Sequence, residues 1–196
     1  MIPSVAQCFR LMDEYRMLDN IRDHSIIVTR IANLLAEELL QTGRSLSLPL
    51  VVAGALLHDI GKTACLDCDR DHAAYGREIC LRHGFTELAP IVGDHVRYRE
   101  NGGQDPGEYE IVFYADKRVT HDQVVSLDER RAYILDRYGR NDPLRIAAIR
   151  ANCLSWERVE AALFEPLSIF PAELAHLIDP DPATCEQSRA KSGTSP

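Results

Sequence analysis

The sequence is short of positive charge and of long hydrophobic runs. Its 22 Lys and Arg residues are outnumbered by 30 Asp and Glu residues, so the formal net charge is -8. Proteins that bind nucleic acid or an anionic membrane surface usually present a basic face. The longest apolar run, residues 50–57, is far shorter than the roughly 20 residues needed to cross a bilayer. We therefore expect neither nucleic acid nor a membrane as a partner.

Cysteine is also scarce, with 6 in 196 residues. That density is too low for a disulfide scaffold, so reduced thiols are expected. Arg10, Asp13 and Glu14 interrupt the first apolar stretch, and no secretory signal is recognisable there. These observations predict a cytoplasmic protein that is long enough to bury one sizeable core.

Alternating strand patterns are almost absent, and apolar residues recur instead at spacings of three and four. We expect Asn20 to cap the second helix, and Gly43 and Gly61 to stop the second and third helices. Ser126 opens a capping box with Glu129. The sequence therefore predicts an all-α fold. The expected helices cover residues 3–18, 20–43, 50–60, 73–83, 87–97, 108–120, 126–139 and 142–163.

Polar residues stand where these helices should be buried. His58 and Asp59 end a helix that is apolar on nearly every side, and an ionised Asp is costly there unless it is paired or binds a cation. His24, His95 and Asp116 also fall on apolar faces. Any one of them alone is explained by a core hydrogen bond or ion pair, but together they favour a divalent metal site. Imidazole nitrogens with carboxylate oxygens suit Fe, Mn, Zn, Co or Ni better than Ca.

His24, the motif HDIGK at residues 58–62 and the motif ADK at residues 115–117 follow one another in this order. The arrangement resembles the HD superfamily of metal-dependent phosphohydrolases, and the resemblance covers about residues 20–120. It implies an HD-domain helical bundle with the metal held between helices. The metal ligands that it implies are His24, His58, Asp59 and Asp116.

Two more histidines match the additional ligands of binuclear HD enzymes. His72 opens the segment HAAYG, and His95 precedes the YAD triplet at residues 114–116. These segments are similar to those of bacterial HD-type dinucleoside tetraphosphate hydrolases. The resemblance implies two metal ions bridged by Asp59, which would make Asp59 a catalytic residue. A water held between two such ions is an activated nucleophile.

Basic residues near these motifs are candidates for binding phosphate. The chain has only 3 lysines, and two of them, Lys62 and Lys117, directly follow ligand segments. Lys62 lies one helical turn after the His-Asp pair, so we expect it to contact the substrate phosphate and to assist catalysis. Arg97 is a further candidate for binding substrate. Arg99 and Arg118 are expected to be solvated surface charges.

The cysteines offer a competing interpretation. Cys65 and Cys68 have the C-x-x-C spacing, and His72 and Cys80 follow them, so the four could form a structural zinc site. The second pair lacks tight spacing, however, and the binuclear pattern uses His72. Reduced thiols on the solvent side are the favoured interpretation.

The residues and the resemblance lead to one principal function and two alternatives. The principal hypothesis is a metal-dependent phosphohydrolase acting on a nucleotide-like small molecule, with a dinucleoside polyphosphate as the leading substrate. The alternatives are a catalytically quiet ligand-binding HD module and an HD-fold di-iron oxygenase. A module that has lost catalysis usually loses some ligands, whereas here every position of the pattern is filled.

Three segments are expected along the chain. Residues 1–125 should form the HD-type domain, and residues 126–178 should add C-terminal helices packed on the same core. This extension would cap the core or pair with a second copy in a homodimer. Residues 179–196 are rich in Pro, Ser, Thr and Ala without periodicity, which predicts a flexible tail.

Overall fold

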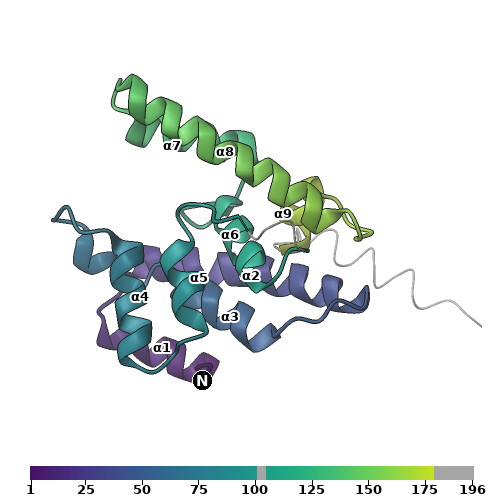
Figure 1. Ribbon diagram of the computed structural model, residues 1–196, viewed down its shortest axis with the longest axis horizontal. Coiled ribbons are helices and arrows are strands. Elements are labelled where there is room, and N and C mark those ends of the chain that lie inside the picture. The colour runs from purple at the N-terminus through teal and green to yellow at the C-terminus, as the bar shows by residue number, and fades with distance from the viewer. Residues whose placement is uncertain (101–104, 179–196) are drawn as a thin grey trace, which may run out of the picture.

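The computed structural model describes residues 1–100 and 105–178, and this part of the chain is almost entirely helical (Figure 1). It contains nine α-helices and two short 3-10 helices, and its strands are limited to two of two residues each. The prediction of an all-α fold is confirmed. The expected tail at residues 179–196 lies outside the described residues. None of the described helices is long and apolar enough to pass through a bilayer.

The first lobe is built around one central helix. This helix, α3, is apolar on all sides and packs against α1, α2, α5 and α6. Gly54 allows the close approach, because a Cβ there would lie 2.9 Å from Ile91 Cγ2 and 3.2 Å from Val112 Cγ2. The elements of the lobe are α1 (Val5–Glu14), α2 (Asp19–Gln41), α3 (Leu48–Leu57), η1 (Thr63–Cys65), α4 (His72–Arg82), α5 (Leu88–Asp94) and α6 (Glu108–Lys117).

A helical hairpin rises from this lobe (Figure 1). Helices α7 and α8 pack against each other and project beyond α6, while α9 returns to contact α2. The capping box at Ser126 and the Asp142 cap before Pro143 are both present. The elements are β1 (Val119–Thr120), β2 (Gln123–Val124), α7 (Leu127–Gly139), α8 (Pro143–Phe164), η2 (Pro171–Glu173) and α9 (Leu174–Ile178).

Several predicted helix boundaries were wrong. Helix α1 ends at Glu14 rather than Leu18, and helix α5 ends at Asp94 rather than Arg97. Leu18, not Asn20, is the N-cap of α2. Helix α3 ends at Leu57 rather than Ile60, and the His58 Nδ1 atom bonds the Ala55 carbonyl at 2.8 Å, which occupies one of the last helical acceptors. Helix α6 ends at Lys117 instead of continuing to residue 120. The chain then reverses through a tight β1–β2 turn with His121 in the left-handed region, at φ 57°.

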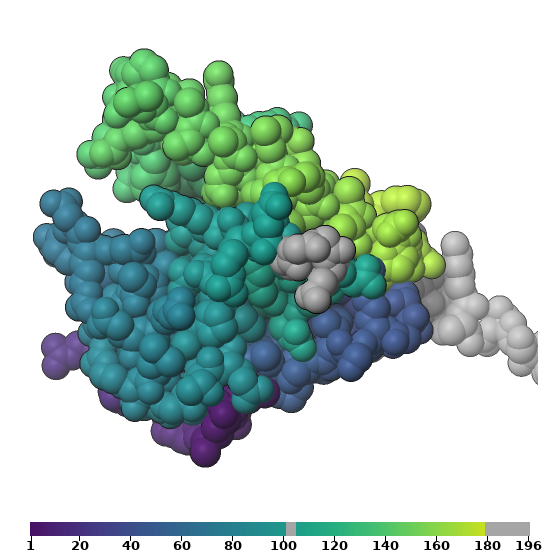
Figure 2. Space-filling view, in the orientation of Figure 1, coloured from purple at the N-terminus to yellow at the C-terminus, as the bar shows by residue number. Residues whose placement is uncertain are grey.

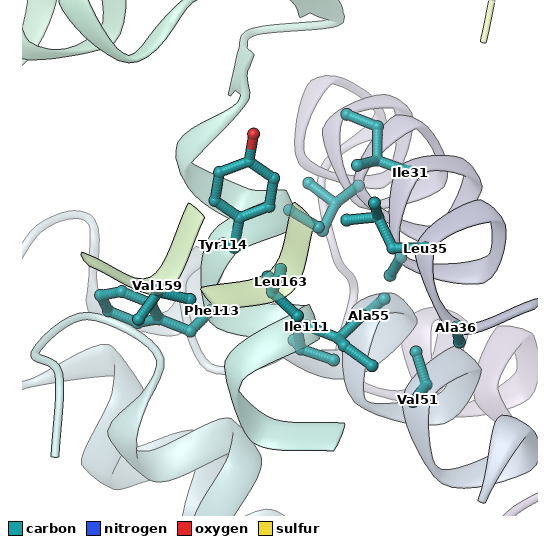
Figure 3. Packing of buried hydrophobic residues seen from close by; sticks show 14 of the residues in the cluster. Ile31, Leu35, Ala36, Val51, Ala55, Ile111, Phe113, Tyr114, Val159 and Leu163 are labelled. Carbon is teal, nitrogen blue, oxygen red and sulfur yellow. The ribbon is translucent and has the colours of Figure 1, made fainter. Parts of the chain in front are cut away.

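Two hydrophobic clusters hold the elements together. The larger joins α2, α3 and α6 to the C-terminal half of α8, where Val159 and Leu163 are buried in the same cluster as Ile111 and Phe113 (Figure 3). The smaller joins α1, α3, α4 and α5 and includes Met12 and Leu57. Burying each such side chain stabilises the fold by roughly 1.5–3 kcal/mol. The base of the hairpin is therefore fixed to the first lobe by a hydrophobic cluster that both share.

Arg118 is buried, so the prediction that it is a solvated surface charge was wrong. Its guanidinium donates to the Val125 carbonyl at 2.7 Å, to the Pro171 carbonyl at 2.9 Å and to the Tyr114 hydroxyl. Tyr114 in turn donates to Glu160 Oε2 at 2.6 Å. Segments that come later in the chain cover the end of α6, and this network ties α6 to α8.

The cysteines do not form the zinc site that their spacing allowed. Cys80 is buried beside Cys8 in the smaller cluster, while Cys68 is exposed. The groups of metal-ligating side chains that the structure brings together in residues 1–100 and 105–178 include no cysteine. The five cysteines in these ranges are all free thiols.

This burial predicts a clear order of thiol reactivity. Burial raises the pKa of Cys8 to about 11 and that of Cys80 to about 12. The thiolate is the reactive form, and a raised pKa leaves little of it at pH 8. In native protein at pH 8 an alkylating reagent should modify Cys68 first, and Cys8 and Cys80 only after denaturation. Site-resolved mass spectrometry would measure this order, and rapid native labelling of Cys80 would contradict it.

Candidate metal centre

The six side chains predicted as metal ligands lie together at one end of the helical bundle. Each comes from a different helix or helix end, apart from the adjacent pair that follows α3. Five of them are buried, and the sixth, His72, is half-buried at the start of α4. The remaining five are His24 on α2, His58 and Asp59 after α3, His95 after α5 and Asp116 on α6.

One group of potential ligands forms around His58. Its Nε2 atom lies 3.4 Å from Asp59 Oδ2 and 3.7 Å from Asp116 Oδ1. His24 Nε2 lies 3.1 Å from the same Asp116 oxygen. Ligand atoms of His24, His58 and Asp59 all fall within 4.8 Å of one another. One divalent ion could be held by these nitrogens and oxygens.

A second group uses the other oxygen of Asp59. Its Oδ1 atom lies 3.4 Å from His72 Nε2 and 3.5 Å from His95 Nε2. These three ligand atoms also fall within 4.8 Å of one another. The Asp59 carboxylate therefore stands between the two groups and offers one oxygen to each. This is the geometry expected of a bridging ligand.

Backbone carbonyls fix the orientation of three imidazole rings. His24, His58 and His95 each direct Nδ1 at a carbonyl, which assigns the proton to Nδ1 and leaves Nε2 to act as a metal ligand. The carbonyls belong to His121 at 2.9 Å, Ala55 at 2.8 Å and Val92 at 2.7 Å, respectively. Burial also lowers the pKa of His95 to about 4, so its ring is neutral near pH 7.

The side chains of the candidate centre fit a bound metal ion. His58 Nε2 is fully buried, and within the described part of the chain it has no hydrogen-bond partner. A buried polar atom without a partner is costly and uncommon in native proteins. A cation between His58 and the carboxylates would satisfy it. The mixture of imidazole and carboxylate matches Fe, Mn, Zn, Co or Ni.

Neighbouring side chains keep both carboxylates ionised. Burial alone would raise the pKa of Asp59, but His58 and Lys62 hold that pKa well below its usual range. Lys117 does the same for Asp116, whose pKa is also well below normal despite burial. The two anionic ligands are therefore charged near pH 7.

A large cavity opens over these carboxylates. Its volume is about 1060 Å³, and its far wall is formed by α7 and α8. In Figure 2 the surface is hollowed between the outer end of this hairpin and the segment that precedes α4. Among the described residues that line it, seven are cationic and three are acidic, although the whole chain is acidic. The cationic residues are Lys62, Arg70, Arg97, Lys117, Arg130, Arg145 and Arg158.

The HD domain family model matches residues 21–138, a span that includes all six candidate ligands. This chain belongs to the HD domain family.

Relatives of this HD protein include two kinds of larger protein. Ribonuclease Y of Pseudothermotoga lettingae is 42% identical over 88 residues, covering 44% of this chain and 15% of that protein. The tRNA (cytidine(56)-2'-O)-methyltransferase of Picrophilus torridus is 30% identical over 170 residues, covering 80% of this chain and 46% of that protein. This HD protein thus corresponds to less than half the length of either relative.

A third relative is closer in size. An uncharacterized protein of Methanocaldococcus jannaschii is 30% identical over 139 residues, covering 64% of the HD protein and 81% of the relative. No solved structure matches the chain significantly. None of these relatives is named as a dinucleoside tetraphosphate hydrolase, so the finer resemblance to those enzymes stays a prediction.

The three residues predicted to bind substrate occupy different positions around the candidate metal centre. Lys62 is half-buried at the cavity, and its Nζ atom donates to Asp59 Oδ2 at 2.7 Å. Arg97 is exposed on the cavity wall. Lys117 is buried, where its Nζ atom bonds Asp116 Oδ2 at 2.6 Å and the His95 carbonyl at 2.8 Å. In this position Lys117 links two ligand segments.

The contribution of the α7–α8 hairpin to the candidate metal centre was not predicted from the sequence. Arg130, on α7, reaches to within 3.7 Å of Asp116 Oδ1 and lines the cavity. Its neighbour Arg131 instead pairs with Glu157 on α8. The two arginines stand side by side in a charged helix, so the sequence carries no signal that separates them. Only the packing of α7 over β1 decides which one faces the centre.

Proposed function

We propose that this protein is a metal-dependent phosphohydrolase that cleaves a phosphoester or phosphoanhydride bond of a nucleotide-like small molecule. The observation that carries the proposal is the position of Asp59, between two groups of potential ligands at the floor of a basic cavity. A dinucleoside polyphosphate is the leading substrate, in keeping with the HAAYG and YAD segments.

Each part of the centre has a distinct task in this proposal. The six histidine and aspartate side chains would hold two divalent ions, which when bound supply an activated water and a clamp for phosphoryl oxygens. Burial alone would lower the pKa of Lys62, but Asp59 raises it, so the Lys62 amine stays protonated. Lys62 faces the cavity and can donate a hydrogen bond to a phosphate oxygen. Lys117 positions Asp116 and the His95 backbone.

The cavity suits a nucleotide better than an isolated phosphate. Its volume, about 1060 Å³, is at the upper end of the range for small-molecule sites. Its cationic side chains favour a multiply charged anion. Apolar side chains of the hairpin, including Ile134, Ile149 and Trp156, line the same space and could contact a base.

A substrate panel tests the proposed function. We expect Mn²⁺-loaded protein to release phosphate from nucleotides, with dinucleoside polyphosphates among the best substrates. A single-stranded oligonucleotide, included because two relatives are named ribonuclease or tRNA enzymes, should be a poor substrate. Binding without turnover would favour the quiet regulatory module, and oxygen consumption without phosphate release would favour the di-iron oxygenase. Either result would refute the hydrolase.

Metal analysis tests the second group of ligands. Wild-type protein purified without chelators should contain about two ions per chain, and His72→Ala about one, because the His24, His58 and Asp59 group is left intact. Elemental mass spectrometry would measure both. His83→Ala is the matched control, since His83 lies at the other end of α4 and hydrogen-bonds Tyr15. Full metal content in His72→Ala would rule out the binuclear centre.

Substitution of Lys62 should reduce activity less than substitution of a metal ligand. Lys62→Ala removes one charge-assisted hydrogen bond to phosphate, which predicts a loss of roughly 10- to 100-fold in kcat/KM. The change should appear mainly in KM, with metal content unchanged. Steady-state kinetics on the best substrate, together with elemental analysis, would check this. Loss of metal in Lys62→Ala would instead show that the Lys62–Asp59 pair builds the centre.

A further inference from the structure

Arg130 reaches the metal centre from outside the segment that carries the HD motifs. Its side chain is 13% exposed, and its Nη2 atom lies 3.7 Å from Asp116 Oδ1. Its Nη1 atom lies 3.5 Å from Thr120 Oγ1 on β1, and its guanidinium is 5.8 Å from the centre of the Tyr133 ring. These contacts place a nearly buried cation beside the last ligand of the motif.

The protein itself uses little of the hydrogen-bonding capacity of this guanidinium. Its Nε atom is buried and has no partner within residues 1–100 and 105–178. The distance to Asp116 is too long for a hydrogen bond. Asp116 already has a closer cationic partner, Lys117, whose Nζ atom lies 2.6 Å from Asp116 Oδ2. Neutralising Asp116 therefore does not explain why a nearly buried arginine stands here.

The position of Arg130 and the chemistry of its guanidinium indicate a role for its unused hydrogen-bond donors. Arg130 lines the same cavity as Asp59 and Lys62, on the side formed by α7. A guanidinium presents a planar fork of donors that matches phosphate oxygens, and such a cation stabilises the charge of a phosphoryl group in transfer. We propose that Arg130 is a further catalytic residue, which binds the phosphoryl group of the substrate from the hairpin side while Lys62 binds it from the side of the first lobe.

This inference rests on the proposed phosphohydrolase function and adds the hairpin to its machinery. The metal ligands all lie between residues 24 and 116, whereas Arg130 belongs to the helices after them. A phosphoryl group over the carboxylates would thus be enclosed by two lobes. The α7–α8 hairpin completes the active site.

The experiment compares Arg130→Met and Arg130→Lys with Arg131→Met as the matched control. Arg131 pairs with Glu157 and Asp128 and is not among the described residues that line the cavity. Three quantities are measured on Mn²⁺-loaded protein: the Kd of inorganic phosphate by calorimetry, kcat/KM on the best nucleotide substrate, and metal content. The melting temperature is recorded for each variant.

Arg130→Met should weaken phosphate binding by roughly 10- to 100-fold and lower kcat/KM by about 10²-fold or more, with metal content and melting temperature near wild type. Arg130→Lys should recover part of the phosphate affinity, because it keeps the charge but loses the fork. Arg131→Met should match wild type. Unchanged phosphate affinity in Arg130→Met would overturn the inference, as would a loss explained by missing metal or a large drop in melting temperature.

The phosphate measurement also separates this inference from the proposed function. If wild-type protein hydrolyses no member of the panel, the proposed function fails, and the Kd of phosphate still reports whether Arg130 binds the anion. If the panel reveals a good substrate but Arg130→Met binds phosphate and turns over like wild type, the function stands and the role of Arg130 is refuted.

Discussion

Asp59→Ala is expected to lower kcat/KM by on the order of 10³-fold or more. Asp59 places one oxygen in each of the two ligand groups, 3.4 Å from His58 Nε2 and 3.4 Å from His72 Nε2. Its removal takes one potential ligand from both groups, and two bound ions would then lack an anion between them. Phosphate release and metal content, measured on the same preparation, would check the prediction.

Two comparisons sharpen the Asp59 experiment. Asp59→Asn keeps the shape but not the charge, and should also lose most activity because the amide cannot serve as an anionic bridge. Asp69→Ala removes an exposed carboxylate from the nearby loop and should behave like wild type. Wild-type phosphate release by Asp59→Ala would refute the phosphohydrolase mechanism proposed for this centre.

Gly61→Ala is expected to destabilise the protein by about 3 kcal/mol, near the upper end for overpacking. A Cβ at this position would lie 2.4 Å from the His72 carbonyl oxygen and 2.9 Å from Gly76 N. Both are backbone atoms of α4, which cannot move aside as a flexible side chain can. The start of α4 would be pushed away, and His72 with it, so metal content should fall as well.

Urea unfolding and elemental analysis would measure the two effects of Gly61→Ala. Gly107→Ala is a suitable control, because the nearest atom to its Cβ is Glu110 Oε2 at 3.8 Å, an ordinary contact. We expect that substitution to cost less than about 1 kcal/mol, the effect of a weaker residue at the N-cap of α6. If the two alanine variants were equally stable, the close crossing at Gly61 would not be the reason for glycine in the HDIG motif.

The ligand cluster was predictable because it breaks the local pattern. His24 and Asp116 interrupt apolar helical faces, and a polar residue on such a face must find a partner in the core. The helices were predictable from their periodicity for a similar reason, since each amphipathic face must be buried. Both inferences depend on short stretches of sequence and not on how distant segments pack.

What could not be predicted depends on contacts between distant segments. The early end of α3 follows from the His58 ring bonding the Ala55 carbonyl and from the crossing of α4 at Gly61. Arg118 is buried because η2, more than 50 residues later, covers it. Arg130 faces the centre and Arg131 does not, yet the two are the same amino acid in adjacent positions. No local rule distinguishes such residues.

The α7–α8 hairpin is fixed at its base and free at its tip, so the two ends can tolerate different substitutions during evolution. The buried network of Tyr114, Arg118 and Glu160 anchors the base, whereas Tyr138 and Arg145 stand near the tip and line the outer cavity. Substitutions at the tip can reshape the pocket without disturbing the ligands. We therefore expect substrate preference to evolve independently of the bond-breaking chemistry, so that grafting another hairpin tip would change which molecules enter and not how they are cleaved.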